Sequence, residues 1–184
     1  MRKLISFIAV TTDGFTEGPE GEFDWPVVDD AFNEFSISQL HDLGALLFGR
    51  VGYEGMASYW PTPMAEEDDP VITSLMNAIP KYVFSNTLGS ADWANTTLVS
   101  GEAGPAVAKL KEQDGHDLAI FGSATLTASL LEQGLVDEVR VMVMPILLGG
   151  GVSLFSALTK RVPLTLVRTM TFPSSGNVLL VYKP

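Results

Sequence analysis

The stretch DLAIFGSATLTASLL, Asp117–Leu131, decides the fold of this 184-residue chain. It opens with a short apolar run that is typical of a buried strand. It then passes through Gly122-Ser123-Ala124 into a helical pattern, with apolar residues at Leu126, Leu130 and Leu131. A helix that begins where a strand ends leaves free backbone N–H groups, which form with the helix dipole a site for an anion such as phosphate. The alternative is an ordinary junction in which the glycine only allows tight packing.

Two further strands in the chain end in residues that suit a ligand. Leu43–Phe48 is followed by Gly49-Arg50, and a short helix begins at Val51. Arg50 can bind a phosphate through its bidentate guanidinium, or it can pair on the surface with Glu54, four residues on. The strand Lys81–Ser85 runs into Asn86, and polar side chains at the carboxyl ends of strands are where α/β sheets bind ligands.

The alternation of strand and helix patterns predicts the α/β class. Strands are expected at 2–10, 98–99 and 139–145, and helices near Asp29, at 70–78 and at 103–113. The tail, 164–172 and 178–182, predicts two antiparallel strands. Acidic residues 66–69 predict a solvated loop, and Gly149-Gly150-Gly151 predicts a turn. We therefore expect one three-layer domain over 1–184, a mostly parallel mixed sheet with helices on both faces and an antiparallel C-terminal pair.

Composition excludes several classes of function. The net charge of −11 disfavours binding to nucleic acid and to anionic membranes. The chain has no cysteine, and its two histidines are isolated, so no metal site is expected. No apolar run approaches the roughly 20 residues that span a bilayer. Because no export signal precedes the first strand, we expect a cytoplasmic protein.

The three strand ends, GRVGYEGM, VFSNT and IFGSATLTASLL, follow one another in an order that resembles the dihydrofolate reductase-like family. The closest resemblance is to its riboflavin-biosynthesis reductase branch (the RibD C-terminal domain). TTDGF after the first strand, GLVDE at 134–138 and PILLGGG at 145–151 support it. The resemblance covers nearly the whole chain and implies a dihydrofolate reductase-like fold.

The resemblance implies that NADPH lies across the carboxyl ends of the strands. Gly49, Arg50 and Val51 would contact its phosphates, and Ser85 and Asn86 its adenine-ribose side. The residues expected to hold the pyrophosphate are Gly122, Ser123, Ala124, Thr125 and Leu126. Val51 replaces a common Thr or Ser, and Asn86 replaces a common Arg that binds the 2′-phosphate. These departures leave NADH open as an alternative cofactor.

Two carboxylates are candidates for the proton source, with an ordered water as the third possibility. Asp30 lies five residues after Trp25, a spacing similar to that of the catalytic carboxylate in dihydrofolate reductases. Asp13 follows the first strand, where the riboflavin-type branch keeps an aspartate. Their alternatives are a helix cap and a turn residue. Trp25, Phe35, Tyr53 and Trp60 are expected to line a pocket for a planar ring, or else to be packing residues.

The predicted function is an NAD(P)H-dependent reductase that transfers a hydride to a small heterocyclic, pterin- or pyrimidine-like, C=N or carbonyl group. The alternative is a dinucleotide-binding protein of the same fold with little or no catalysis. The zinc site of a riboflavin-pathway deaminase is absent, since the chain lacks cysteine. The resemblance also implies a homodimer.

Overall fold

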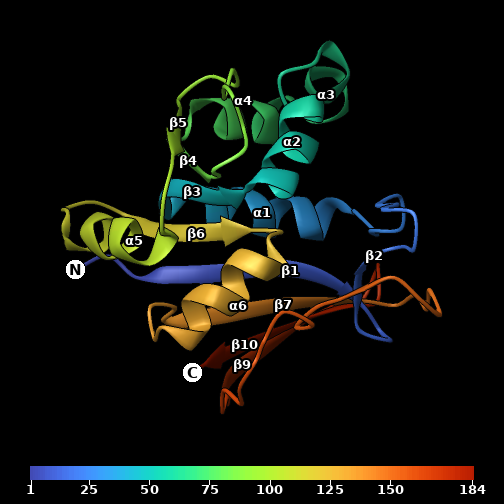
Figure 1. The fold of residues 1–184 in the computed structure, drawn as a ribbon. Coiled ribbons are helices and arrows are strands. Elements are labelled where there is room, and N and C mark those ends of the chain that lie inside the picture. The colour runs from blue at the N-terminus through green and yellow to red at the C-terminus, as the bar shows by residue number, and fades with distance from the viewer.

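An eight-stranded sheet with the order β5-β4-β3-β6-β1-β7-β10-β9 forms the centre of the fold (Figure 1). A computed structural model describes all residues, 1–184. In this order each pair of neighbours from β5 across the sheet to β7 is parallel. Strand β10 is antiparallel to both of its neighbours, β7 and β9. The strands of this sheet are β1 (Leu4–Thr11), β3 (Leu43–Gly49), β4 (Lys81–Phe84), β5 (Thr96–Val99), β6 (Asp117–Phe121), β7 (Glu138–Met144), β9 (Thr165–Phe172) and β10 (Asn177–Lys183). The predicted mixed sheet with an antiparallel C-terminal pair is confirmed.

Helices cover both faces of the sheet. They are α1 (Asp30–His41), α2 (Arg50–Tyr59), α3 (Pro63–Asp68), α4 (Pro70–Ala78), α5 (Ala103–Glu112) and α6 (Ala124–Glu132). Helices α5 and α6 pack on one face, where Val107, Leu126 and Leu130 join one apolar core with β1 and β6. Helices α1, α2 and α4 pack on the other face. None of these helices combines the length and apolar character needed to cross a membrane.

Helix α1 begins where the sequence predicts. The side chain of Asp29 caps it by accepting a hydrogen bond from the backbone N–H of Phe32 at 2.9 Å. Asp29 therefore satisfies one of the N–H groups that the first turn leaves without an intrahelical partner. Asp30 is the first residue of the helix and lies exposed to solvent.

The acidic residues 66–69, predicted as a loop, belong instead to α3 and its junction with α4. The Thr62 hydroxyl caps α3, and Pro63 occupies its first turn, where the missing N–H of proline costs no hydrogen bond. Asp69 then caps α4 through the N–H of Ile72 at 2.8 Å. The loop prediction was wrong because Thr62 and Pro63 start a short helix, α3, that has no long apolar repeat. The helix predicted at 70–78 is confirmed as α4.

The glycine run at 149–151 forms the predicted turn. It precedes the short strand β8 (Val152–Ser153), which pairs with β2 (Phe15–Glu17) at the carboxyl edge of the sheet. Gly151 has a φ of +136°, and a Cβ atom there would collide with the carbonyl of Glu17. Only glycine fits this close approach, so the run is explained by packing between two backbones.

The connections leave β3 and β6 toward opposite faces of the sheet. From β3 the chain reaches β4 through α2, α3 and α4, whereas from β6 it reaches β7 through α6 on the other face. Because β3 and β6 are neighbours, their carboxyl ends form a topological switch point, the place where open α/β sheets generally have a crevice. In α/β sheets such a switch point is where ligands bind.

Candidate functional site

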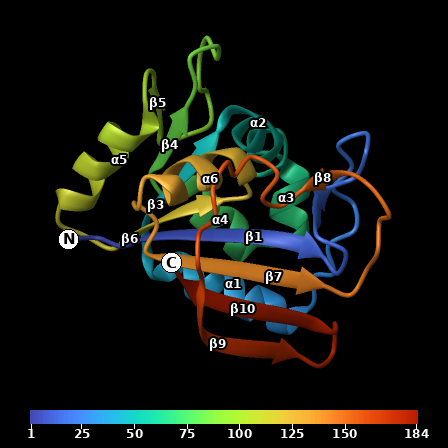
Figure 2. The same cartoon turned by 60° about the horizontal axis from the view of Figure 1, so that its bottom comes forward.

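The structure brings the three predicted strand ends together. β4, β3 and β6 are consecutive neighbours in the sheet and run parallel, so their carboxyl ends share one edge (Figure 2). At the usual spacing of about 4.8 Å between strands, the outer two ends lie about 10 Å apart. Gly49-Arg50-Val51, Ser85-Asn86 and the segment 122–126 therefore lie side by side along one edge of the sheet.

Glycines at and near the start of α2 allow the β3–α2 junction to contact the β6–α6 junction. A Cβ atom on Gly49 would lie 2.8 Å from the hydroxyl oxygen of Ser123, and one on Gly52 would lie 3.7 Å from the carbonyl oxygen of Phe121. The N-terminal turn of α2 thus rests directly against the turn between β6 and α6. The positive ends of two helix dipoles face the same crevice, which favours an anion there.

The turn between β6 and α6 presents backbone donors without a cap. Gly122 adopts a φ of +63° and donates its own N–H to the carbonyl of Phe7. The hydroxyl of Ser123 makes no capping hydrogen bond, so it remains available to a ligand. The first-turn N–H groups of Ala124, Thr125 and Leu126 have no intrahelical partner. The side chain of Leu126 is buried in the core, so its contribution is limited to the backbone.

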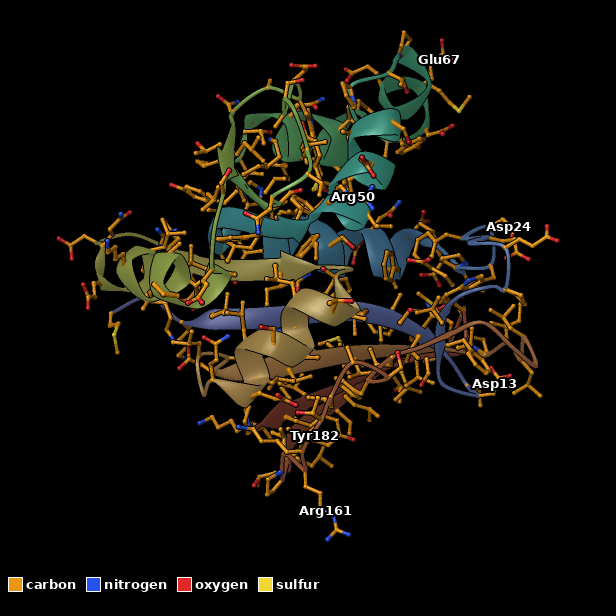
Figure 3. All side chains as sticks on the ribbon, in the orientation of Figure 1. Asp13, Asp24, Arg50, Glu67, Arg161 and Tyr182 are labelled. Atoms are coloured by element: carbon orange, nitrogen blue, oxygen red, sulfur yellow. The ribbon has the colours of Figure 1, made fainter.

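Arg50 stands at the start of α2 (Figure 3). It pairs with Glu54. Its Nη1 lies 2.8 Å from the Glu54 carboxylate, and each side chain is 47% exposed. The surface pair that the sequence offers as an alternative is thus present, but an exposed pair of this kind is weak and leaves Nη2 without a partner. Val51, 60% exposed, brings no hydroxyl to the site.

Ser85 and Asn86 organise the end of β4. The Ser85 hydroxyl oxygen accepts hydrogen bonds from the N–H groups of Thr87 and Leu88, at 3.1 and 3.0 Å. The side-chain oxygen of Asn86 accepts from the N–H of Gly101 at 2.6 Å. The Asn86 bond joins the β4 end to the turn before α5, whereas the Ser85 bonds stay within the loop that follows β4. The amide nitrogen of Asn86 has no partner and is free to donate to a ligand.

Asp13 holds a loop at the carboxyl end of β1. Its carboxylate accepts hydrogen bonds from the Thr11 hydroxyl at 2.6 Å and from the N–H groups of Leu148 and Gly149, at 3.1 and 2.7 Å. The bond from Thr11, followed by that from Gly149, lowers the pKa of Asp13 below its usual range. At neutral pH Asp13 is therefore an ionised acceptor that fixes the 147–149 turn.

Asp30 lies farther along the same edge. Its neighbour Asp29 accepts from the Ser174 hydroxyl at 2.5 Å, and the Asn177 side chain donates to Val27 at 2.9 Å, so the start of α1 sits over the β9–β10 hairpin. The bond from Ser174 lowers the pKa of Asp29. β1 and β7 lie between β6 and β10, a lateral distance of about 14 Å. Asp30 makes no hydrogen bond and faces solvent.

The four candidate substrate aromatics fall into two groups. Trp25 and Phe35 pack in the core beneath α1 and β10, where the Phe35 ring lies 5.9 Å from those of Phe7 and Phe172. Tyr53, on α2, is buried against Trp93, and its hydroxyl oxygen accepts a hydrogen bond from the backbone N–H of Trp93 at 3.0 Å. Trp60 donates to the sulfur of Met56 at 3.1 Å. The structure does not gather the four around one pocket.

Two side chains that the sequence reading passed over border the crevice. The Met56 methyl group lies 4.0 Å from where a Cβ of Gly122 would be, and the ring of Phe7 packs 5.4 Å from that of Phe121. Met56 could have been found from its spacing, because it follows Gly52 by four residues and so lies on the same face of α2, one turn on. Phe7 carried no such signal, because its position depends on the pairing of β1 with β6.

The family model of the RibD C-terminal domain matches residues 2–178. The chain belongs to the RibD C-terminal domain family. The resemblance seen in the sequence is thereby confirmed. The expected dihydrofolate reductase-like fold is confirmed too, because the solved structures described below match 98% of the chain.

Three similar proteins illustrate the relationship. YyaP of Bacillus subtilis (strain 168) is 35% identical over 98% of this chain and 94% of its own length. A crystal structure from Shewanella sp. PV-4, named as a riboflavin biosynthesis protein, matches with a TM-score of 0.75 and 25% identity, covering 98% of both chains. Dihydrofolate reductase from Enterococcus faecalis, solved with NADP(H), has a TM-score of 0.64 at 15% identity, covering 98% and 95%. The last likeness concerns the fold alone.

Proposed function

We propose that this RibD-family chain is an NADPH-dependent reductase that transfers a hydride to a C=N or carbonyl group of a small pterin- or pyrimidine-like heterocycle. The observation that carries the proposal is the contact of Gly49 with Ser123, which sets two helix N-termini against one crevice. Net charge cannot attract the cofactor, since the chain carries −11. The local donors of the two turns therefore supply the anion site.

The residues fit a dinucleotide at three contacts. The uncapped N–H groups of 124–126 and the Ser123 hydroxyl would hold the pyrophosphate, Gly49-Arg50-Val51 would contact phosphate oxygens, and Ser85-Asn86 would meet the adenine ribose. Gly122 leaves room at its exposed position, because a Cβ there would have only the Met56 methyl group within 4 Å. NADPH, when bound, supplies the hydride. NADH is the second choice, since Asn86 offers no charge to a 2′-phosphate.

Proton delivery is assigned first to Asp30. Its carboxylate is free of protein contacts, whereas Asp13 is occupied by three donors. A free carboxyl group can pass a proton to substrate directly or through one water. Among the aromatics, Trp60 donates a hydrogen bond to Met56, whose methyl group lies beside Gly122 at the crevice. Trp60 is therefore the first candidate to contact the heterocycle.

One titration separates this reaction from the binding-only alternative, which Val51 and Asn86 favour. NADPH and NADH are added separately while tryptophan fluorescence is followed, and nicotinamide absorbance is then monitored with pterin and pyrimidine substrates. Saturable quenching by NADPH and loss of absorbance with one substrate class are expected. Saturation without turnover of any substrate would favour the binding module, and no binding of either dinucleotide would refute both.

We also propose a homodimer, with the cytoplasm as its compartment. The edge strand β9 is exposed along nearly its whole length (Figure 2). Leu166, Val167 and Met170 on it are large exposed apolar side chains. An unpaired edge of this kind is commonly covered by another chain. Sedimentation of the wild type and of Val167→Lys tests the proposal, since the dimer should dissociate only in the variant, and a monomeric wild type would overturn it.

A further inference from the structure

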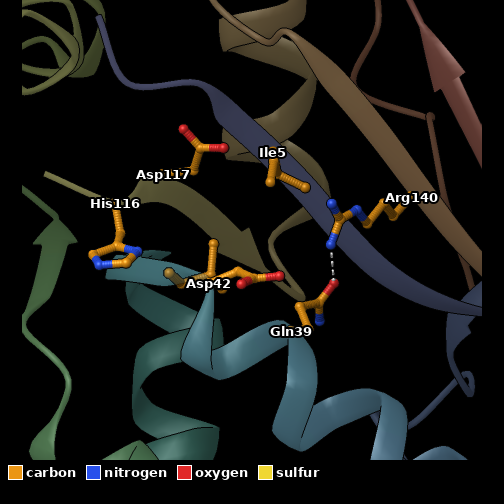
Figure 4. Close-up of a pocket in the computed structure, with 7 residues that line it drawn as sticks. Ile5, Gln39, Asp42, His116, Asp117 and Arg140 are labelled. Carbon is orange, nitrogen blue, oxygen red and sulfur yellow. Dashed lines mark hydrogen bonds between the residues drawn. The ribbon is translucent and has the colours of Figure 1, made fainter.

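A polar pocket lies at the amino edge of the sheet, opposite the crevice. Its volume is about 320 Å³, and Figure 4 shows the residues that line it. They come from the starts of four parallel strands and the end of α1: Ile5, Gln39, Asp42, Leu43, His116, Asp117 and Arg140. Because β6 runs from Asp117 to Phe121 between the two edges, the pocket is about 16 Å from Gly122 at about 3.3 Å per residue. It is therefore separate from the proposed dinucleotide site.

One side of the pocket carries a fixed cation. The Nε of Arg140 donates to Glu138 at 2.6 Å, and its Nη1 donates to the side-chain oxygen of Gln39 at 2.8 Å. The Arg140 side chain is only 15% exposed, and its guanidinium points from β7 into the pocket (Figure 4). Nη2 and the amide nitrogen of Gln39 have no acceptor. The pocket thus keeps two oriented donors that suit a carboxylate.

The other side carries free carboxylate oxygens. Asp117 uses one oxygen to accept the N–H of Lys3 at 2.7 Å, and its second oxygen has no partner. Asp42 ends α1 through its backbone, and its side chain makes no hydrogen bond. The ring of His116 is likewise unpaired. A group with several N–H donors and a positive charge suits this side of the pocket.

The separation of opposite charges selects the class of ligand. A simple anion would be repelled by Asp42 and Asp117. A simple cation would leave Nη2 of Arg140, which is already paired with Glu138 through Nε, and the amide nitrogen of Gln39 without acceptors. A zwitterion places its carboxylate at Arg140 and Gln39 and its ammonium at the aspartates. The apolar lining is limited to Ile5 and Leu43, which disfavours a large apolar side chain. We propose that this pocket binds a small free α-amino acid.

The full-length protein is titrated with each of the twenty proteinogenic amino acids, and binding is followed by amide chemical shifts and calorimetry. Acetate and methylamine, which carry one half of the charge pair each, are the ligand controls. Saturable binding is expected for one or more small amino acids, with shifts at 39–43, 116–117 and 140. Acetate and methylamine should bind at least tenfold more weakly.

Asp42→Asn tests the pocket without disturbing the fold, because the Asp42 side chain makes no hydrogen bond. It should weaken binding at least tenfold. Asp114→Asn, which removes the same charge from an exposed position outside the pocket, should leave binding unchanged. The proposal is overturned if no amino acid saturates, if acetate binds as well, or if both variants behave alike. The Arg140–Gln39 bond would then serve only to tie α1 to β7.

Discussion

Gly49 and Ser123 lie so close that a Cβ atom on Gly49 would be 2.8 Å from the Ser123 hydroxyl oxygen. They belong to junctions that are far apart in the chain, and each junction starts a helix without a side-chain cap. Their contact places two sets of free N–H groups at one crevice. Because a side chain at position 49 would collide with the Ser123 hydroxyl, glycine at this position lets the two junctions lie this close.

A double-mutant cycle tests this contact. Gly49→Ala should reduce the free energy of unfolding by about 1–2 kcal/mol, because the new methyl group crowds the Ser123 hydroxyl. In the Ser123→Ala background, where that oxygen is absent, the loss should be clearly smaller. Urea unfolding of the four proteins measures both losses. Strictly additive effects would show that the two residues do not touch.

A negative charge introduced at position 122 is expected to block dinucleotide binding. Gly122→Asp places a carboxylate beside the proposed pyrophosphate and should abolish NADPH binding. Gly122→Asn has nearly the same shape and no charge, and both residues tolerate the φ of +63° better than other side chains do. Fluorescence titration should therefore separate the two variants by more than tenfold. Equal affinities, in proteins with equal melting temperatures, would refute the pyrophosphate assignment.

Arg50 and Glu54 should have opposite effects on the cofactor. Arg50→Gln removes a cation near the proposed phosphates and should weaken NADPH binding about tenfold. Glu54→Gln frees the same guanidinium from its partner and should strengthen binding. Each change should alter the free energy of unfolding by less than about 1 kcal/mol, because the pair is exposed. If neither variant changes the affinity, Arg50 serves only in the surface pair.

Substitutions of Asp30 and Asp13 should have different effects, the first on catalysis and the second on stability. Asp30→Asn is expected to reduce kcat strongly with an unchanged melting temperature, since Asp30 makes no hydrogen bond. Asp13→Asn should instead lower the melting temperature, because it weakens the bonds to Leu148 and Gly149. A reduced kcat at unchanged stability in Asp13→Asn alone would reverse the assignment.

Because of Lys81, the free energy of unfolding should change with pH in the alkaline range. The residue is 1% exposed. Its ammonium donates to the carbonyls of Met76 and Ile79 at 2.8 and 2.7 Å and lies 4.4 Å from the ring centre of Trp93. Burial lowers the pKa of Lys81 from 10.5 to about 8. Between these values the unfolded chain binds more protons, so the free energy of unfolding should rise with pH.

Urea unfolding between pH 8 and pH 10 measures that rise. Lys81→Met should abolish it, because the titrating group is gone. Lys109→Met, which removes a lysine from the exposed side of α5, provides the control and should keep it. A wild-type stability that stays level or falls over this interval would contradict a lowered pKa for Lys81.

Local patterns in the sequence were enough to predict most elements of this fold. The apolar run at 118–121 and the leucines at 126, 130 and 131 predicted β6 and α6, and both are confirmed. Asp29 was one of two expected caps, and it is the one observed. Helix α3 was missed, because six residues are too few to show an apolar repeat and its start depends on Thr62 and Pro63.

The amino-acid sequence by itself determined which strands exist, where each ends, and which ends carry glycines or polar residues. These features depend on periodicity, caps and turns, which act over a few neighbouring residues. Only the tertiary structure decided that β6 inserts between β1 and β3, and hence that Gly49 meets Ser123. It likewise separated Trp25 from Trp60 and formed the amino-edge pocket from Gln39, Asp117 and Arg140. Strand order follows from burying both faces of the whole sheet at once, which no local stretch of sequence specifies.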